Sequence, residues 1–455
     1  MTRRLKSIRS RSNSLPLPAR DGIKPTITMT NNNSKTIYQS LGRAPVHPFP
    51  ARMAPGIAID VLSHTPKGHR VLDPMAGSGT VLALARSFGH YAVGVDIDPL
   101  AVLISKVWTT SLNTGVTVSQ AREVLGEAKA LYKSTNSESA FPPCSDEETR
   151  KFMNYWFDDT SRRQLAALAT AIDRVQQATI RDALWCAFSR LIITKKAGAS
   201  LAMDLSHSRP HRAYTEAPIV PFEKFQSAVL KVIENCIDYR APSRGPATRV
   251  LEGDARKLPV HSESIDLALT SPPYLNAIDY VRCSKFTLVW MGYTVSELRQ
   301  LRSNSVGTEV GKYDTENDTQ IIGVMDDLKL RPALDSRQTA LVSRYIDDMR
   351  GAMSEVSRVL APSGRAIYVV GENTIRGTYV RNSIIISSVA EIFGLVLQSK
   401  HERTLPANRR YLPPPAKSGK NESMDARMRK EVVLEFKKSS VNSTIPSFQY
   451  RAFPS

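Results

Sequence analysis

The chain has 455 residues, enough for one large or two ordinary domains with sizeable hydrophobic cores. Its formal net charge of +18 and isoelectric point near 9.8 favour a polyanionic partner, of which nucleic acid is the commonest, over an uncharged one. A basic surface that only keeps the protein soluble is the alternative. No apolar run reaches the roughly 18 residues that a membrane span needs, so we expect no membrane partner.

The four cysteines show no C-x-x-C pair and no His-rich spacing. They are Cys144, Cys186, Cys236 and Cys283. This usage predicts reduced thiols in a cytoplasmic protein and no metal site. The His-x-Glu and Pro-Cys-x-x-Cys pattern of zinc deaminases is also absent from the sequence.

Both ends of the chain are predicted to be tails. Residues 1–35 are rich in Arg, Ser, Asn and Thr, and Asp21 is their only acid. They lack the apolar core of a secretory signal, so we expect a disordered basic tail. An organellar transit peptide has a similar composition and stays open as an alternative. Residues 441–455 are assigned to a second tail.

A proline-rich segment, V-H-P-F-P-A-R-M-A-P at 46–55, precedes a predicted helix over 57–63. Its prolines fix Phe49 in a loop just before the first strand. The segment is either part of a ligand pocket or purely structural.

The next stretch, R-V-L-D-P-M-A-G-S-G-T at 70–80, is a short apolar strand that breaks into a glycine-containing loop before a helix over 81–88. Gly77 and Gly79 allow the backbone to approach a ligand closely. The amino terminus of the helix offers free N–H groups to a carboxylate or phosphate. These features predict a cofactor loop.

A second strand, 91–96, ends in an acid that lies 19 residues after Gly77. At that separation, the carboxylate of Asp96 can accept hydrogen bonds from the hydroxyls of a ribose. A nicotinamide cofactor is the alternative. It is weakened because Leu82 stands where the G-x-G-x-x-G motif has its third glycine.

Residues 111–244 are too many for an ordinary crossover between strands and predict an inserted, mostly helical subdomain. Apolar spacing near 3.6 occurs over 117–134, 146–177, 180–195 and 221–238. The aromatic run 152–157 is expected to be helix core. Nucleic-acid recognition is the candidate function of this subdomain.

A basic, hydroxyl-bearing loop follows Lys195 and Lys196 in this region, over 206–212. Its candidate nucleic-acid contacts are His207, Arg209, His211 and Arg212, which suit phosphates or base edges. Metal binding is disfavoured because no carboxylate or thiol accompanies the histidines. A solvated loop is the alternative.

The strand over 248–254 ends in Asp254, and a further strand, 265–269, runs into T-S-P-P-Y at 270–274. Two successive prolines fix φ and remove two backbone donors, which leaves a stiff group of acceptors beside the ring of Tyr274. Such a loop suits an exocyclic base amine held by acceptors while the base stacks on the ring. A proline-rich turn with a core tyrosine is the alternative.

The remaining sequence predicts helices over 278–291, 336–360 and 381–393, strands over 365–370, 395–401 and 430–436, and a polar mobile loop over 302–334. The alternation indicates an α/β fold with a doubly wound, mainly parallel sheet that has one antiparallel strand. All the motif loops then lie at the carboxyl ends of strands.

Three motifs together resemble the S-adenosylmethionine-dependent DNA amino-methyltransferases, which methylate cytosine N4 or adenine N6. They are D-P-x-x-G-S-G-T at 73–80, G-V-D-I-D-P at 94–99 and T-S-P-P-Y at 270–274. The resemblance covers roughly 40–110 and 245–440. It implies a seven-stranded Rossmann-like methyltransferase core over 36–110 and 245–440, S-adenosylmethionine as cofactor and DNA as partner, and allows a cognate restriction endonuclease. The serine before the proline pair makes the loop resemble that of the cytosine-N4 members. Adenine-N6 members more often carry Asp or Asn at this position.

The resemblance also implies roles for individual residues. The catalytic loop is Ser271, Pro272, Pro273 and Tyr274. The cofactor residues are His47, Phe49 and Pro50 over the methionine part, Asp73, Pro74, Met75, Ala76, Gly77, Gly79 and Thr80 in the glycine loop, Asp96 and Ile97 at the ribose, and Asp254 and Ala255 at the adenine. Arg409, Arg410 and Tyr411 are candidates for contact with the target base.

Other functions are open alternatives or are disfavoured by particular residues. An RNA base amino-methyltransferase shares the core, and a catalytically silent nucleic-acid-binding relative would keep the fold. Protein glutamine methylation is disfavoured by Ser271 and by the basic charge. Cytosine-C5 chemistry needs a Pro-Cys nucleophile, and only Cys144 follows a proline, outside the core strands. Amino-methyltransferases are grouped by where their recognition region falls between the cofactor and catalytic motifs, and the position of this insertion matches no group cleanly. Which part of the chain recognises the target DNA sequence therefore stays open.

Overall fold

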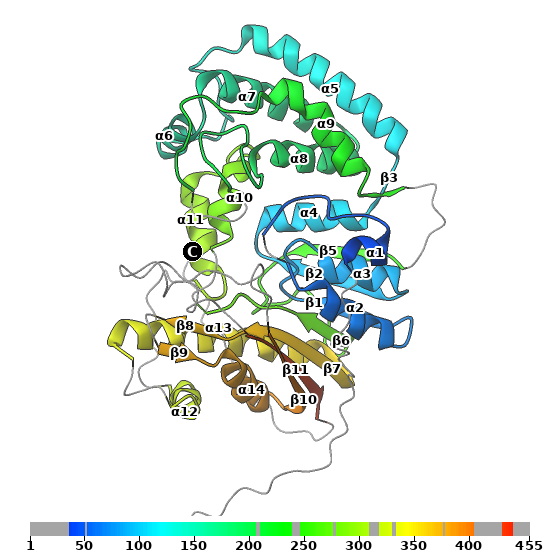
Figure 1. Cartoon of the computed structure of the whole chain (residues 1–455), viewed down its shortest axis with the longest axis vertical. Helices are drawn as coiled ribbons and strands as arrows, with labels where there is room; N and C mark the ends of the chain where they lie inside the picture. Colours follow the sequence, from blue (N-terminus) through cyan, green and yellow to red (C-terminus); the bar gives the residue numbers. More distant parts are fainter. Residues whose placement is uncertain are drawn as a thin grey trace, which may run out of the picture.

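A computed structural model describes residues 36–50, 52–205, 210–238, 246–275, 279–308, 318–329, 334–375, 378–404 and 430–439. These residues form a seven-stranded sheet with the order β10-β11-β7-β6-β1-β2-β5 (Figure 1). The strands are β1 Arg70–Asp73, β2 Tyr91–Asp96, β5 Thr248–Glu252, β6 Ile265–Thr270, β7 Leu360–Gly371, β10 Leu395–Thr404 and β11 Lys430–Lys438. Pairing is parallel from β5 to β7, and β11 is antiparallel to both neighbours. The predicted doubly wound, mainly parallel sheet is confirmed.

The direction of the strand order reverses between β1 and β6. The chain builds β2 and β5 on one side of β1, and then places β6 and β7 on the other side. The two central strands pair in parallel, with Val71 opposite Leu267 and Leu72 opposite Ala268. In open sheets of this kind, ligands bind outside the carboxyl ends of the strands at such a reversal. The loops after β1 and β6 therefore mark where a functional site is expected.

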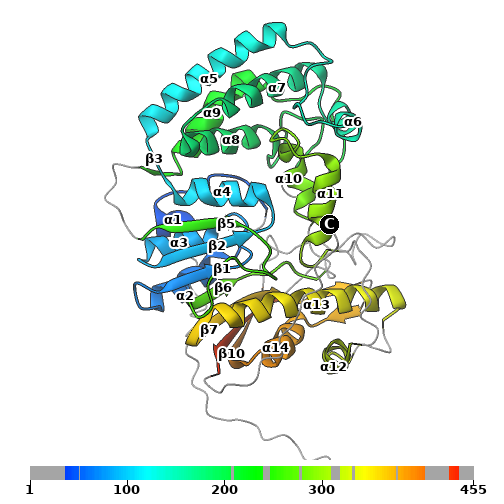
Figure 2. The ribbon, with the colours of Figure 1, turned by 180° about the vertical axis from the view of Figure 1, so that it is seen from behind.

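Helices cover both faces of the sheet. One face carries α2 Pro55–His64, α3 Thr80–Ser87 and α4 Pro99–Thr109, and the other carries α12 Thr319–Asp327, α13 Ser336–Val359 and α14 Asn382–Ile392. Figure 2 shows α13 running along the second face beside β7. Apolar side chains from α2 and α3 pack on Val71 and Leu267, while those of α13 and α14 pack on Leu72 and Ala268. Alternate residues of the strands thus face opposite helix layers.

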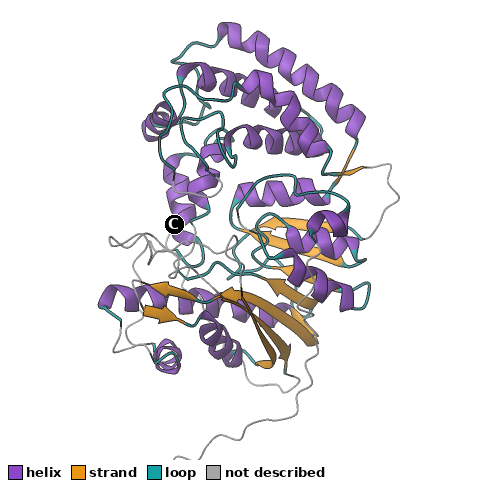
Figure 3. Ribbon diagram, viewed as in Figure 1, coloured by secondary structure: helices purple, strands orange, loops and turns teal. Residues whose placement is uncertain are grey.

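A further layer of helices lies over α4, at the top of Figure 1. It consists of α5 Thr114–Ser134, α6 Glu147–Trp156, α7 Asp159–Asp173, α8 Ala178–Ile192 and α9 Pro221–Ile233 (Figure 3). The buried side chains of Trp108 on α4 and Phe188 on α8 belong to the apolar cluster that joins this layer to the core. At its base, β3 Ser111–Leu112 and β4 Ile237–Asp238 pair in parallel. The chain thus leaves and re-enters the core through a two-stranded ladder.

Three features of the fold differ from the sequence predictions. The single helix expected over 146–177 is two helices, because the Asp158 side chain accepts from Ser161 N at 2.9 Å and starts α7 anew. The prediction of a mobile loop over 302–334 is partly wrong, since α12 lies within this stretch. Asp318 caps that helix, and Ile321 and Val324 are buried. A hairpin of β8 Asn373–Ile375 and β9 Thr378–Val380 was not predicted.

Most other elements agree closely with the predicted ones, but α1, α11 and the β3–β4 ladder were not predicted. The helices α10 Val281–Leu288 and α11 Val295–Asn304 follow the second motif loop, and α1 Ile37–Leu41 opens the described chain. Within the described residues, no helix has both the length and the apolar character that crossing a bilayer requires.

Candidate functional site at the carboxyl ends of the strands

The glycine loop after β1 is held tightly against its surroundings. Gly77 and Gly79 have positive φ values of 51° and 82°, which side chains other than glycine rarely adopt. A Cβ atom at Gly79 would lie 2.8 Å from Ser105 Oγ. The same hydroxyl donates to Gly77 O at 2.8 Å. Glycine is therefore required at this start of α3 for both backbone conformation and space.

Asp96 lies beside this loop at the end of β2. Its carboxylate accepts hydrogen bonds from Gly77 N at 2.7 Å and from Asp98 N at 2.9 Å. Burial raises the pKa of Asp96, and the backbone hydrogen bonds act in the opposite direction. The acid predicted at 19 residues from Gly77 thus contacts the glycine loop directly. Asp98 has a different task, because its side chain caps α4 at Leu100 N.

Asp73 joins the two motif loops. It is the last residue of β1 and only 3% exposed. Its Oδ1 accepts from Thr270 Oγ1 at 2.8 Å and from Met75 N at 3.2 Å. Burial raises the pKa of Asp73 to about 7. Because Thr270 is the first residue of T-S-P-P-Y, this hydrogen bond ties the glycine loop to the proline loop.

In the proline loop, both polar side chains are anchored on the sheet. Ser271 Oγ donates to Val369 O on β7 at 3.0 Å, which leaves the lone pairs of the hydroxyl oxygen available as acceptors. Tyr274 Oη lies 3.3 Å from Ser271 Oγ and donates to Glu431 Oε1 on β11 at 3.3 Å. Arg403 holds Glu431 through an ion pair of 2.5 Å. The loop is therefore rigid for side-chain as well as backbone reasons.

After β5, Asp254 lies on the same edge, but its carboxylate is engaged by Arg256. Arg256 donates to Asp254 at 2.7 Å, to Asp348 on α13 at 2.5 Å and to Asn304 O at 2.5 Å. The second oxygen of Asp348 accepts from Gly307 N at 3.0 Å. Sequence reasoning found Asp254 and missed Arg256 and Asp348. No local signal identified this pair, because its members are 92 residues apart.

The proline-rich segment before α2 lies between the sheet edge and the helices α8 and α10. His47 is 1% exposed, with Nε2 3.0 Å from Ser189 Oγ on α8. Burial lowers the pKa of His47 well below its usual range, so the ring is neutral. Phe49 is also buried, with its ring centroid 6.4 Å from that of Tyr280. Pro50 is half-buried beside it.

The nucleic-acid candidates are only partly described. Met203 N donates to His211 O at 3.3 Å, and the guanidinium of Arg212 lies 5.3 Å from the ring of Tyr155. The candidates His207, Arg209, Arg409, Arg410 and Tyr411 lie outside the described residues.

The aromatic run on α6 is mostly helix core, as predicted. Met153 and Phe157 are buried, and Trp156 packs on Phe286 of α10 with ring centroids 5.0 Å apart. Tyr155 is the exception, because 52% of it is exposed.

Replacing Asp96 with alanine is expected to weaken S-adenosylmethionine binding at least tenfold, since it removes the carboxylate that the sequence predicts at the ribose and frees Gly77 N. Calorimetric titration of the cofactor measures the change. The control is Asp98→Asn, which keeps the cap of α4 and removes a neighbouring charge. Unchanged affinity in Asp96→Ala would remove Asp96 from the site.

The folding stability should fall between pH 5 and pH 8, and Asp73 should cause part of the fall. Burial raises the folded pKa to about 7, above the unfolded value of 3.8, so its stabilising contribution is complete below pH 3.8 and is lost as the pH rises to about 7. Asp73→Asn keeps an oxygen for Thr270 and should reduce the fall by about 1–4 kcal/mol, at about 1.36 kcal/mol per pKa unit. Urea unfolding at both pH values tests this. Equal falls in the two proteins would contradict it.

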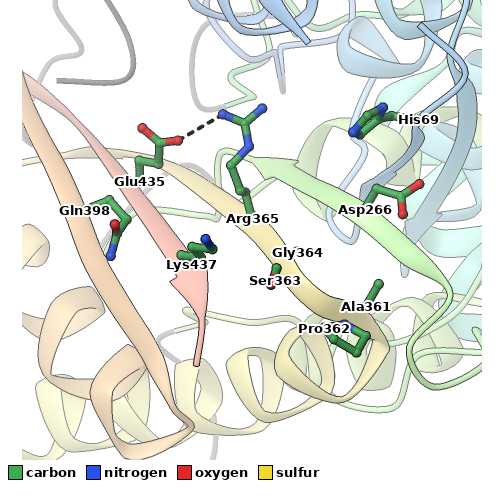
Figure 4. A pocket seen from close by; sticks show the side chains of 10 residues that line it. All are labelled: His69, Asp266, Ala361, Pro362, Ser363, Gly364, Arg365, Gln398, Glu435 and Lys437. Atoms are coloured by element: carbon green, nitrogen blue, oxygen red, sulfur yellow. Dashed lines mark hydrogen bonds and ion pairs between the residues drawn. The ribbon is translucent and has the colours of Figure 1, made fainter. Parts of the chain in front are cut away.

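A cavity of about 380 Å³ lies at the opposite edge of the sheet, beside the amino ends of β1, β6 and β7 (Figure 4). Its acids are already paired: Glu435 with Arg365 at 3.1 Å, and Asp266 with Arg70 at 2.7 Å. None of the residues predicted for the site lines it. It is therefore separate from the candidate site. Among the described residues, no group of three or more His, Cys, Asp or Glu side chains is arranged to hold a metal ion.

Together, the fold and the site place the chain in a class. It is a doubly wound α/β protein in which a glycine loop, an acid at the tip of the second strand and a rigid proline loop share one edge of the sheet, at the reversal of strand order. Proteins of this class bind nucleotide-like cofactors at that edge.

Comparison with known proteins gives particular relatives. The chain is similar to the type II methyltransferase M.MvaI of Kocuria varians, with 22% identity over 416 residues that cover 86% of this chain and 90% of the relative. It is also similar to the type II methyltransferase M.AvaI of Nostoc sp. (strain PCC 7120), with 21% identity over 363 residues, 71% of this chain and 73% of the relative. No protein-family model matches the chain.

Solved structures resemble it only weakly. A TehB-like SAM-dependent methyltransferase from Corynebacterium glutamicum aligns with 84% of this chain and 86% of its own, at 12% identity and a TM-score of 0.27. A SAM-dependent methyltransferase from Methanosarcina mazei aligns with 83% of this chain and 96% of its own, at 8% identity and a TM-score of 0.29. Likenesses of this size support no conclusion about the reaction.

Proposed function

We propose that this protein is a DNA methyltransferase that transfers a methyl group from S-adenosylmethionine to the exocyclic amino group of a base, with cytosine N4 as the favoured target. One observation carries the proposal: the glycine loop and the T-S-P-P-Y loop follow adjacent parallel strands and are joined by the hydrogen bond from Thr270 to Asp73. The similarity to M.MvaI and M.AvaI over most of the chain supports it.

The cofactor would lie over the glycine loop. The amides of that loop suit its charged end, Asp96 suits the ribose hydroxyls, and the segment of His47, Phe49 and Pro50 would close over the methionine part. Asp254 and Ala255 would lie toward the adenine. Since Arg256 already engages the carboxylate of Asp254, we expect Asp254 to use only its remaining acceptor capacity there. The bound cofactor supplies an electrophilic methyl group.

The proline loop would prepare the nucleophile. The lone pair of an aromatic amine is delocalised into its ring, so the amine must be oriented before it can attack. The Ser271 hydroxyl oxygen, fixed by its own donation to Val369 O, and the Pro272 carbonyl would accept from the two amino hydrogens. The lone pair then points toward the methyl group, while the extruded base stacks on Tyr274. The new N–C bond would form as the C–S bond breaks, and the nitrogen would release a proton to solvent, because a hydroxyl and a carbonyl oxygen are not basic enough to keep it.

Ser271 is the reason to favour cytosine. Serine at this position resembles the cytosine-N4 enzymes, whereas the adenine-N6 enzymes more often have Asp or Asn there. Adenine N6 remains the second candidate because the same pair of acceptors fits either amine. For the wider DNA contact, we propose the basic loop with His207, Arg209, His211 and Arg212, and the residues Arg409, Arg410 and Tyr411 near the base.

Nucleoside mass spectrometry tests the proposal. The full chain is incubated with methyl-labelled S-adenosylmethionine in two separate reactions, one with unmodified genomic DNA and one with total RNA. The nucleic acid from each reaction is then digested to nucleosides. Labelled N4-methylcytosine in DNA is the expected product. Labelled N6-methyladenine would overturn the choice of base, and label in RNA alone would overturn DNA as the substrate. No label in either, with binding of DNA retained, would indicate a silent relative.

A further inference from the structure

A second cavity, of about 370 Å³, lies between the segment 44–52 and the carboxyl end of α8. We call it the α8 cavity. Its lining includes four nitrogen-bearing side chains, those of His47, Arg52, Arg190 and Lys195. None of its lining residues carries a carboxylate. The cavity is therefore electropositive, which favours an anionic occupant.

Arg190 is the clearest sign that this cavity suits an anion. It is half-buried on α8, and its Nη1 donates to Val46 O at 2.7 Å. Burial lowers the pKa of Arg190, so its charge is held at a cost. Among the ion pairs of the described residues, none includes Arg190. An anion beside this guanidinium would compensate the charge and accept from its remaining donors.

His47 supplies a second, independent sign. Its side chain is almost fully buried, and Nδ1 has no hydrogen-bond partner among the described residues. Nε2 lies 3.0 Å from Ser189 Oγ, which lies 2.9 Å from Thr287 Oγ1. When the serine hydroxyl donates to Nε2, the neutral ring carries its proton on Nδ1. The imidazole then offers one N–H donor that the described protein leaves unused.

We infer that the α8 cavity binds a backbone phosphate of the nucleic-acid substrate. The inference rests on the proposed function for the identity of that substrate. The cavity is built by the helical layer and the segment before α2. Of its lining residues, only His47 is also placed at the cofactor, and none belongs to the glycine loop or is Asp96. Lys195 lies at its rim and leads into the basic loop through Lys196, whose carbonyl accepts from Asp204 N at 2.8 Å. Both features favour the polyanion over the cofactor.

The test is the salt dependence of binding to a 20-base-pair duplex of arbitrary sequence, because phosphate contacts do not depend on sequence. Lys195→Gln is the main variant, since the side chain is exposed and its loss should not affect folding. Arg190→Gln removes the buried charge. Lys129→Gln, on the outer helix α5, is the matched control with the same charge change.

For Lys195→Gln we expect the slope of log K against log salt to become shallower by about 0.9, the value for one phosphate contact. The control should retain the wild-type slope. A slope in Lys195→Gln equal to that of the control would overturn the inference. The fold of Arg190→Gln is checked by circular dichroism, and if it is intact its slope should also become shallower.

Two further measurements separate the sources of the anion. Calorimetry with S-adenosylmethionine should give the same affinity for Lys195→Gln and wild type, and a weaker affinity would assign the cavity to the carboxylate of the cofactor. The second measurement is a titration of the wild type with inorganic phosphate. If phosphate saturates the protein and the slope of log K for DNA binding against log salt does not change, the α8 cavity is assigned to a small anion. Either result overturns the inference. If the wild type forms no methylated nucleoside but the slope shift is observed, the proposed reaction fails and the phosphate site stands.

Discussion

Ser271→Ala is expected to lower the turnover number by about 100-fold or more, while the affinity for S-adenosylmethionine stays within about twofold of wild type. The hydroxyl oxygen is an acceptor fixed by donation to Val369 O, and alanine removes it without changing the proline backbone. Tyr274→Ala should act in the same way, because it removes the ring proposed to stack on the base, and such stacking contributes about 1–3 kcal/mol for a base.

Tyr274→Phe is the matched control for these variants. It keeps the ring and removes only the hydroxyl that donates to Glu431, so we expect a smaller loss of turnover than in Tyr274→Ala. Single-turnover methylation at saturating cofactor and calorimetric titration of the cofactor measure the two effects separately. Loss of cofactor affinity in step with turnover in both alanine variants would place the two residues in the cofactor site instead.

Asp348→Ala is expected to lower the free energy of unfolding by about 3 kcal/mol, at the low end for breaking a buried ion pair. The carboxylate is fully buried against Arg256, and its loss also leaves Gly307 N without its acceptor. Asp254 still compensates Arg256, which moderates the loss. Urea unfolding of the full chain provides the measurement.

The control for Asp348→Ala is Glu147→Ala, which breaks an exposed ion pair with Lys151 and should change stability little. The loss of unfolding free energy in Asp348→Asn should lie between those of Asp348→Ala and Glu147→Ala, because the amide oxygen can still accept from one donor. A loss in Asp348→Ala no larger than in the control would show that the buried pair does not hold the segment after α11 in place.

Much of the fold could be predicted because local signals agree with the tertiary structure. β2 spans the predicted residues 91–96, and α9 begins at Pro221 as predicted, where a proline occupies the first helical turn. The glycine loop and the proline loop each follow a short apolar strand. Parallel strands with helical crossovers bring such loops to one edge, so their proximity follows from topology alone.

What could not be predicted depends on contacts between distant residues. The split between α6 and α7 depends on a cap by Asp158 inside a run of continuous apolar spacing. α12 is short and lies within a polar, charge-mixed stretch, which favoured a loop prediction, and it is stabilised by packing on α13 and α14. The pairing of Arg256 with Asp348 and of Tyr274 with Glu431 joins residues 92 and 157 positions apart. Neither hydrophobic periodicity nor a sequence motif predicts which distant residues will pair.

The anchoring of Tyr274 on β11 has a consequence for how the site is assembled. Every motif residue of the proline loop precedes β11 in the chain, yet the side chain that accepts from the Tyr274 hydroxyl lies on β11, the last strand of the described residues, which also closes the sheet between β7 and β10. A chain in which β11 is not yet paired would contain the complete motif but would lack the acceptor for the Tyr274 hydroxyl. The anchored position of the tyrosine ring thus depends on the completed sheet and not on the loop alone.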